Sequence, residues 1–452
     1  MNLNLPFSVK TYRQRRDRLM KELSKNEQSF TAFFWSGSEI VRNYDSHFPF
    51  RANSDFLYLT GCSEPDTLIL LQKIGNKTRT SIGVRPRDLS HERGSEIWEG
   101  ERLGVERAPK ALGFDEAFDI HKVQTIAEKY MSQAPTLFWG FGEYPEWDQK
   151  IVAMISKVHH NNRGIAIVKN IRDPRPALHE IRKVKTSEEV AIMRRSAEVA
   201  ARGHIRAMRT TKAGQFEYQI AAEVEREFKK GGSEFPAYGS IVATGNNACT
   251  LHYRANNTKV KDGEIILIDA GAEYQGYASD ITRCYPISGK FSPPQKEVYN
   301  WVLKSQIAAI KAVKPGVDFF KPHIAAVKVL CEGLSKMKII KQSPKVILKK
   351  GLWKNFMPHG TSHWLGLDVH DRGVYKRVEN PSESVKLMPG NVLTIEPGLY
   401  FRKDDKRVPA AYRGIGIRIE DDVLVTKKSY DVLSESCPKT VEDIEAACGP
   451  KL

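Results

Sequence analysis

The chain has 452 residues, enough for two or three domains with a sizeable core. Its 41% hydrophobic and 27% charged residues are typical of a globular protein and exclude a fibrous or wholly disordered one. The formal net charge of +16 does not predict a nucleic-acid partner, because the basic residues form no stripe with interleaved aromatic side chains.

The sequence also bears on compartment and cysteine chemistry. It contains no run of about 18 apolar residues, so neither a transmembrane helix nor a membrane partner is expected. The first 20 residues are basic and polar where a secretory signal would be apolar, which favours a cytoplasmic protein. The six cysteines are scattered without a CxxC pair, which predicts free thiols and no disulfide framework.

The first 177 residues are predicted to form an α/β domain. A charged helix is expected at 11–24, followed by an apolar, strand-like run at 29–35. Further apolar runs and helix-like stretches then alternate, the runs at 56–60, 68–72 and 136–139 and the helices at 123–130 and 147–158. Such alternation is typical of a sheet with helices packed on it.

A boundary is predicted near residue 178. Residues 170–182 read NIRDPRPALHEIR, in which Pro174 and Pro176 disfavour helix, so this segment is interpreted as a linker. Thr186 and Glu189 then form a capping box, which predicts the start of a long helix. We therefore expect domains at 1–177 and 178–452.

The second domain is predicted to be α+β. Helices are expected at 187–208, 216–230, 294–313 and 319–337, and strands at 241–244, 264–269, 277–285, 392–396 and 415–420. Because the helices gather early and the strands late, a wound parallel sheet is not expected.

Two aspartates stand at the ends of predicted strands. Asp269 ends the apolar run 264–269, and Asp280 follows eleven residues later, beyond a candidate turn at Gly276. If the two strands pair, the carboxylates can approach each other and repel unless a cation lies between them. A proton shared by the two carboxylates, or an ion pair with Arg283, would relieve this repulsion equally well.

Two glutamates repeat this pattern. Glu396 directly follows the apolar segment 392–395, and Glu420 ends an alternating strand that places Arg418 on the same face. Four uncompensated carboxylates cannot share a buried site, whereas two divalent ions would balance them.

A histidine-rich segment supplies the nitrogen ligand. His359, His363 and His370 lie within 12 residues, in a chain with only 12 histidines. Mixed carboxylate and imidazole ligation suits manganese, cobalt, iron or zinc. The sequence thus predicts a two-metal site, with the ligands Asp269, Asp280, His363, Glu396 and Glu420.

Several motifs resemble those of the pita-bread metallopeptidases, namely ASDITR, HGTSHWLGLDVHD, TIEPGLY and YRGIGIRIEDD. With LHYRANN, FRANSDFLYLTG and EIWEGERLG, the similarity is closest to the Xaa-Pro aminopeptidase (aminopeptidase P) branch of peptidase family M24B. The resemblance implies a creatinase-like α/β domain at 1–177, a pita-bread catalytic domain at 178–452 and two divalent ions, with Mn²⁺ expected.

The resemblance also implies roles for single residues. His252 and His370 would line the substrate pocket, and His359 would assist proton movement. Tyr375 and Arg418 match residues near a bound dipeptide. Trp98 matches an aromatic residue that reaches a neighbouring subunit's site, which implies a homo-oligomer. Arg372 departs from the family pattern, since a small or apolar residue is expected there.

The implied reaction removes an N-terminal residue that precedes proline. A hydroxide bridging the metals would attack the carbonyl before proline, and Glu396 would act as general base and then acid. His370 or His252 would stabilise the oxyanion. The alternatives are a prolidase, which shares all five ligands, a non-catalytic pita-bread binding protein, and a creatinase-type C–N hydrolase.

Overall fold

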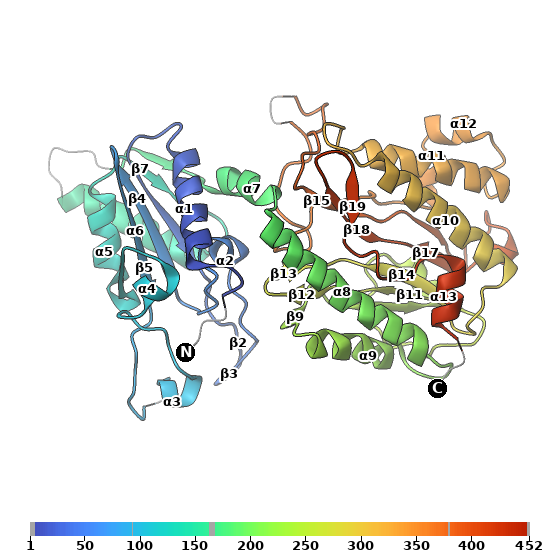
Figure 1. Ribbon diagram of the computed structural model, residues 1–452, viewed down its shortest axis with the longest axis horizontal. Coiled ribbons are helices and arrows are strands. Elements are labelled where there is room, and N and C mark those ends of the chain that lie inside the picture. Colours follow the sequence, from blue (N-terminus) through green and yellow to red (C-terminus); the bar gives the residue numbers. More distant parts are fainter. Residues whose placement is uncertain (1–4, 93, 162–167, 378–379, 450–452) are drawn as a thin grey trace. The chain divides into compact units, whose positions relative to one another are not determined.

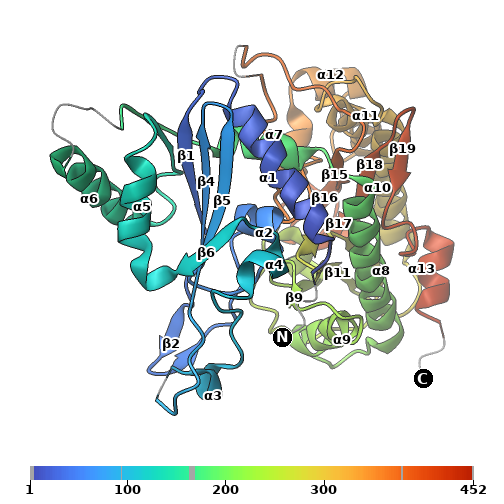
Figure 2. The ribbon, with the colours of Figure 1, turned by 60° about the vertical axis from the view of Figure 1, so that its left-hand side comes forward.

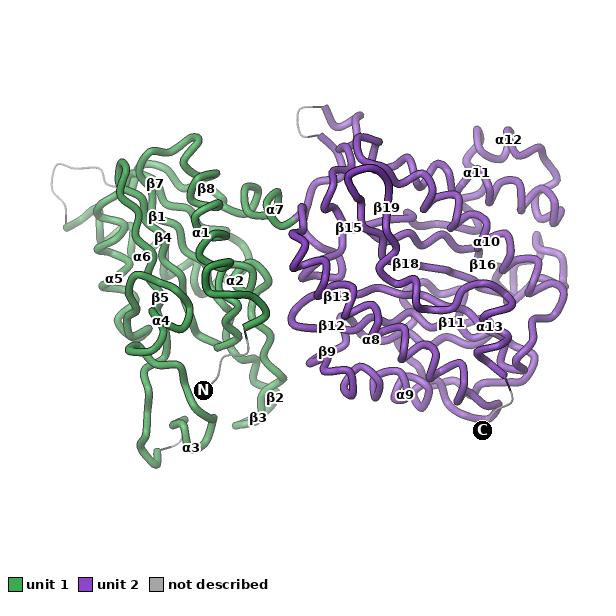
Figure 3. Tube along the Cα trace, in the orientation of Figure 1, with its two compact units in different colours: residues 1–182 green, residues 183–452 purple. Residues whose placement is uncertain are grey.

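A computed structural model describes residues 5–92, 94–161, 168–377 and 380–449 of the chain (Figure 1). The chain forms two compact units, residues 1–182 and 183–452 (Figure 3). Among the described helices, none combines the length and apolar character needed to cross a bilayer.

A six-stranded sheet in the order β6-β5-β4-β1-β7-β8 forms the centre of unit 1. Its strands are β1 (Phe30–Trp35), β4 (Leu68–Ile74), β5 (Lys77–Val84), β6 (Glu116–Asp119), β7 (Thr136–Phe138) and β8 (Asn170–Arg172). β1 pairs antiparallel with β4 and parallel with β7. The expected α/β organisation of this part of the chain is therefore present.

Helices cover both faces of this sheet. Figure 2 shows α5 (Val123–Met131) and α6 (Pro145–Asn161) on one side and α1 (Val9–Leu23) on the other. Phe33 and Trp35, alternate residues of β1, join the core against α5 and α6, where the Trp35 and Trp147 rings lie 4.5 Å apart. All six residues of β1 are buried, as expected for a strand covered on both faces.

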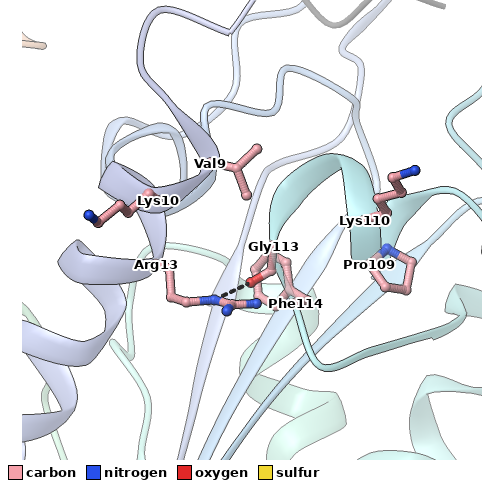
Figure 4. A pocket seen from close by; sticks show the side chains of 7 residues that line it. All are labelled: Val9, Lys10, Arg13, Pro109, Lys110, Gly113 and Phe114. Atoms are coloured by element: carbon pink, nitrogen blue, oxygen red, sulfur yellow. Dashed lines mark hydrogen bonds between the residues drawn. The ribbon is translucent and has the colours of Figure 1, made fainter.

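A buried arginine fastens α1 to its neighbours. Arg16 is fully buried and donates to the carbonyl oxygens of Leu59, Leu112 and Gly113, at the ends of α2 (Ser54–Thr60) and α4 (Ala108–Leu112). One turn earlier, Arg13 donates to the same Gly113 carbonyl at 3.4 Å, beside a surface hollow of about 470 Å³ (Figure 4). Backbone carbonyls thus accept from both terminal nitrogens of this buried guanidinium.

Two short helices correct the predictions for unit 1. The run 56–60 is part of helix α2, because the Asn53 side chain accepts from the first-turn amides and Gly61 closes the helix in the left-handed region. The segment 170–182, predicted as a linker, contains β8 and helix α7 (Arg175–Lys183). Pro176 lies in the first turn of α7, where its missing N–H costs no hydrogen bond.

The remaining elements of unit 1 are small. They are the hairpin β2 (Val41–Asn43) and β3 (Ser46–His47), the helix α3 (Glu96–Glu99) and the 3-10 turn η1 (Ile120–Lys122).

Unit 2 is built from helix pairs and small antiparallel sheets. Its helices are α8 (Ser187–Thr210), α9 (Glu217–Lys230), α10 (Pro293–Ala312), α11 (Lys321–Lys336), α12 (Pro344–Lys349) and α13 (Val441–Ala447). α8 packs on α9 and α10 on α11, and in Figure 2 the helices α8, α10 and α11 lie on one side of the strands β11, β15 and β17. The predicted capping box of Thr186 and Glu189 starts α8.

The strands of unit 2 are β9 (Phe235–Pro236), β10 (Ile241–Thr244), β11 (Ile265–Asp269), β12 (Ala272–Tyr274), β13 (Tyr277–Ala278), β14 (Thr282–Pro286), β15 (Val392–Ile395), β16 (Gly398–Phe401), β17 (Ile415–Arg418), β18 (Asp421–Val425) and β19 (Tyr430–Val432). Unit 2 also contains the short 3-10 helices η2 (Gly245–Cys249), η3 (Leu352–Asn355) and η4 (Ala410–Tyr412). The strands form the sheets β10-β11-β14, β13-β12-β9, β15-β18-β19 and β16-β17. Each helix pair is followed by strands, so the helices do not all precede the strands as the sequence suggested, although the mixed character is as predicted.

Candidate active site

One pocket of about 300 Å³ in unit 2 gathers the predicted site residues of this part of the chain. It is lined by Leu251, His252, Asp269, Asp280, His359, Gly360, Ser362, His363, His370, Tyr375, Glu396, Arg418 and Glu420. All five predicted metal ligands are in this set, together with the predicted histidines, Tyr375 and Arg418.

Asp269 and Asp280 meet because two strands pair. Asp269 ends β11 opposite Thr282 of β14, and Asp280 lies in the break just before that strand. The Tyr238 hydroxyl lies 2.6 Å from Asp269 Oδ1 and 2.5 Å from Asp280 Oδ1, so its single proton goes to one of the two carboxylates. Tyr238 was not predicted, because a lone tyrosine in a loop has no ligand signature.

The two glutamates enter from neighbouring strand ends. Glu396 follows β15, and its amide donates to the Thr361 carbonyl at 2.9 Å. Glu420 lies between β17 and β18, where Thr282 donates its hydroxyl to Glu420 Oε2 at 2.6 Å. A side-chain hydrogen bond therefore holds the Glu420 carboxylate, and a backbone hydrogen bond holds the chain at Glu396.

His363 faces the carboxylates through its Nε2 atom. Nε2 lies 3.3 Å from Asp280 Oδ2 and 3.6 Å from Glu396 Oε1, while Nδ1 lies 3.0 Å from the carbonyl oxygen of Trp364. Since a carbonyl only accepts, Nδ1 carries the hydrogen and leaves the Nε2 lone pair of a neutral ring toward the acids. This is the orientation that a metal-ligating imidazole adopts.

The electrostatics of the pocket call for positive charge. Burial raises the pKa of Glu420, and the negative charges of Asp280 and Glu396 raise it further. Burial also raises the pKa of Glu396 to about 7, despite the opposing charges of His363 and Arg418. Ionised acids in such a place need cations beside them.

The donor set fits divalent metal ions. Ligand atoms of Asp280, His363 and Glu420 all lie within 4.8 Å of one another, and oxygen with imidazole donors suits first-row transition metals. Without such an ion, the hydrogen bond to Asp280 and the charge of Glu396 outweigh burial and raise the pKa of His363 to about 9.

Arg418 supplies part of the compensating charge. It is buried and donates from Nη2 to Asp269 Oδ2 at 2.5 Å and from Nη1 to the Tyr400 hydroxyl at 3.1 Å. Arg283, which the sequence offered as a partner for the aspartate pair, instead binds Asp421 at 2.7 Å. That alternative is wrong, because the alternating register of β14 turns Arg283 away from Asp269.

His359 forms a hydrogen-bonded link to Tyr400. Its Nδ1 lies 2.6 Å from the Gly360 carbonyl, and its Nε2 lies 2.8 Å from the Tyr400 hydroxyl, which therefore donates to it. Burial and the nearby Arg418 lower the pKa of His359 to about 3, so the ring is neutral in this arrangement. Tyr400 was missed at the sequence level, although it lies inside the TIEPGLY motif.

The loop between His363 and His370 is held from both sides. The two imidazole rings lie 4.2 Å apart, and the next residue, Asp371, forms a buried ion pair with Lys185 at 2.8 Å. Tyr375 stacks on Trp364 with ring centroids 6.0 Å apart. This packing fixes which way the histidines point.

Two further predicted residues lie at the surface. Trp98 is part of α3 in unit 1 and is 65% exposed, and its predicted contact with a neighbouring subunit stays a prediction. Arg372, the departure from the family pattern, is exposed beside His370 and contributes no ligand to the pocket.

Known proteins resemble the chain over nearly its whole length. Residues 191–427 match metallopeptidase family M24, and residues 12–138 match the aminopeptidase P N-terminal domain. The Xaa-Pro aminopeptidase of Escherichia coli is 38% identical, with 97% of this chain and 98% of the relative covered. Human Xaa-Pro aminopeptidase 3 is 33% identical, covering 97% and 85%.

Solved structures agree with this similarity. Aminopeptidase PepP of Pseudomonas aeruginosa superposes with a TM-score of 0.94 at 38% identity, covering 98% of each chain. An Escherichia coli aminopeptidase P variant in complex with substrate gives 0.92 at 37% identity, again over 98% of each.

Proposed function

The chain belongs to metallopeptidase family M24 and carries the aminopeptidase P N-terminal domain, and we propose that it is a metal-dependent exopeptidase that releases the N-terminal residue from peptides with proline in second position. The observation that carries this proposal is the single pocket in which four carboxylates and His363 converge. The relatives named Xaa-Pro aminopeptidase supply the substrate class.

We propose that Asp269, Asp280, His363, Glu396 and Glu420 hold two divalent ions, of which manganese is our choice. When bound, such a pair supplies a Lewis acid and lowers the pKa of water toward about 7. The buried carboxylates of Asp280 and Glu420, the lone pair of His363 Nε2 that faces the acids, and the Tyr238 contacts to both aspartates support this assignment.

Glu396 is our candidate for the proton carrier. Its carboxylate lies on the pocket wall, 3.6 Å from the Nε2 of His363 and 3.6 Å from the Nδ1 of His359. From there Glu396 takes the proton of the attacking water and delivers it to the proline nitrogen, which needs one to leave. The Thr394 hydroxyl donates to Glu396 Oε1 at 3.4 Å and helps to orient this carboxylate.

His252 and His370 line the same pocket, and we assign them to the scissile carbonyl. An imidazole N–H that donates to the carbonyl oxygen stabilises the negative charge that develops there. A proline residue has no amide hydrogen, so its subsite needs no acceptor and can be lined by rings alone.

The defining experiment compares Ala-Pro-Ala with Ala-Ala-Ala and with the dipeptide Ala-Pro. We expect release of alanine from Ala-Pro-Ala, little from Ala-Ala-Ala, and loss of activity on chelation that manganese restores. A preference for Ala-Pro would indicate a prolidase. Activity that survives chelation would favour a creatinase-type enzyme. A complete lack of turnover of all three peptides would favour a non-catalytic binding protein.

We further propose a homo-oligomer and a cytoplasmic location. The exposed Trp98 and Ile97 of α3 support self-association, since large apolar side chains at a surface mark contact sites. Light scattering of the wild type and of Trp98→Ala tests the first proposal, with a smaller particle expected for the variant. Fractionation of the source cells tests the second.

A further inference from the structure

A second hollow, of about 470 Å³, lies beside the candidate active site. Its lining consists of Phe319, Phe320, Ser362, Val374, Tyr375 and Lys376. Ser362 and Tyr375 also line the pocket that holds the carboxylates and histidines, so the two spaces adjoin. We call this second space the recess.

The walls of the recess are mainly apolar. The ring of Phe319 is buried and lies 4.9 Å from Tyr375 and 5.3 Å from Phe320. Phe320 and Val374 are 37% and 43% exposed, and they are absent from the core cluster to which Phe319 belongs. Apolar side chains left in water beside a peptide-binding pocket offer a place for another apolar group.

One charge stands on this wall. Lys376 is exposed, and in the described part of the chain no carboxylate forms an ion pair with it. Its position disfavours a second cation and tolerates a neutral or acidic neighbour. The wall of the recess therefore combines apolar side chains with one positive charge.

We propose that the recess is a subsite for the side chain of the residue that follows proline in the substrate, with a preference for apolar side chains and a bias against basic ones. This inference rests on the proposed function. The active-site pocket of about 300 Å³ and the recess share Ser362 and Tyr375, so a peptide whose first two residues lie in the pocket can extend its third side chain into the recess.

The test uses both turnover and binding. Values of kcat/KM are measured for Ala-Pro-Leu, Ala-Pro-Gly and Ala-Pro-Lys, and calorimetry gives the Kd of the products Pro-Leu and Pro-Gly. We expect about a tenfold advantage of leucine over glycine in both readouts, the usual effect of a few methylenes in an apolar subsite, and lysine below glycine. In Phe320→Ala and Val374→Ser the leucine-to-glycine ratio should fall toward one.

The matched control is Ile324→Ala. Ile324 lies on α11, is 50% exposed and lines neither space, so its variant should keep the wild-type ratio. If Pro-Leu and Pro-Gly bind equally, or if Phe320→Ala keeps the full ratio, the subsite is refuted. If no Ala-Pro peptide is cleaved while Pro-Leu still binds about tenfold tighter, the proposed function fails and the subsite stands.

Discussion

Lys185 Nζ lies 2.8 Å from Asp371 Oδ2, and both side chains are almost fully buried. The pair joins the segment before α8 to the residue after His370. Burying a charge costs free energy because the charge loses its hydration, and in a buried ion pair the attraction of the partner offsets that cost. The geometry of the histidine loop is therefore tied to a residue near the start of unit 2.

Removing one partner of this pair should be costly. We expect Lys185→Met to lower the free energy of unfolding by about 3–5 kcal/mol, because Asp371 would lose the buried positive charge that lies 2.8 Å from it. Urea denaturation measures this. Arg195→Ala is the control, since its pair with Glu198 is exposed and should be worth at most about 1 kcal/mol. Equal effects in both variants would contradict the prediction.

Loss of one proposed ligand should remove metal and activity together. Asp280→Asn is expected to bind fewer than the roughly two ions per chain of the wild type and to lose at least about 100-fold in kcat. Metal analysis of the purified protein and Ala-Pro-Ala hydrolysis give the two readouts. The exposed Asp404→Asn serves as control. Full metal content and turnover in Asp280→Asn would overturn the ligand assignment.

The Tyr238 hydroxyl should tune metal affinity without being a ligand. In Tyr238→Phe, the backbone at Asp269 and Asp280 keeps its place, but the two carboxylates lose the hydroxyl that they share. We expect metal affinity to fall about 10-fold to 100-fold, as for other residues that orient ligands. Competition with a chelator of known affinity measures the change, and the unchanged circular dichroism spectrum checks the fold. An unaltered affinity would show that the hydroxyl is dispensable.

Acid should weaken unit 2 through Asp421. Burial alone would raise the pKa of Asp421. The positive charges of Arg283 and Lys439 outweigh burial and lower this pKa from 3.8 to about 2. Because the folded-state pKa is the lower one, this carboxylate stabilises the fold above pH 3.8, and the contribution disappears as the pH falls toward 2. It amounts to about 2 kcal/mol.

The pH dependence of unfolding tests this. Asp421→Asn should be less stable than the wild type at neutral pH and should show a shallower loss of stability between pH 4 and pH 2, because one titrating group is gone. Asp431→Asn, whose side chain is 41% exposed, should keep the wild-type slope. An identical slope for Asp421→Asn would contradict the prediction.

Much of the fold could be read from periodicity and caps. The capping box of Thr186 and Glu189 marks the start of α8, because two side chains satisfy amides that the helix leaves open. The apolar run that forms β1 is clear because both faces of that strand are buried. α2 was missed, since its caps lie in residues flanking an apolar run that suits strand and helix equally.

The sequence by itself indicated that Asp269, Asp280, His363, Glu396 and Glu420 share one site, because acids that follow apolar strands and clustered histidines are improbable unless something binds them. Only the tertiary structure decided which arginine compensates Asp269, that Tyr238 lies between two carboxylates, and that a recess adjoins the site. The physical reason is that tyrosine, arginine and phenylalanine serve equally as core or as site, and only their partners in space, which register and packing select, distinguish the two.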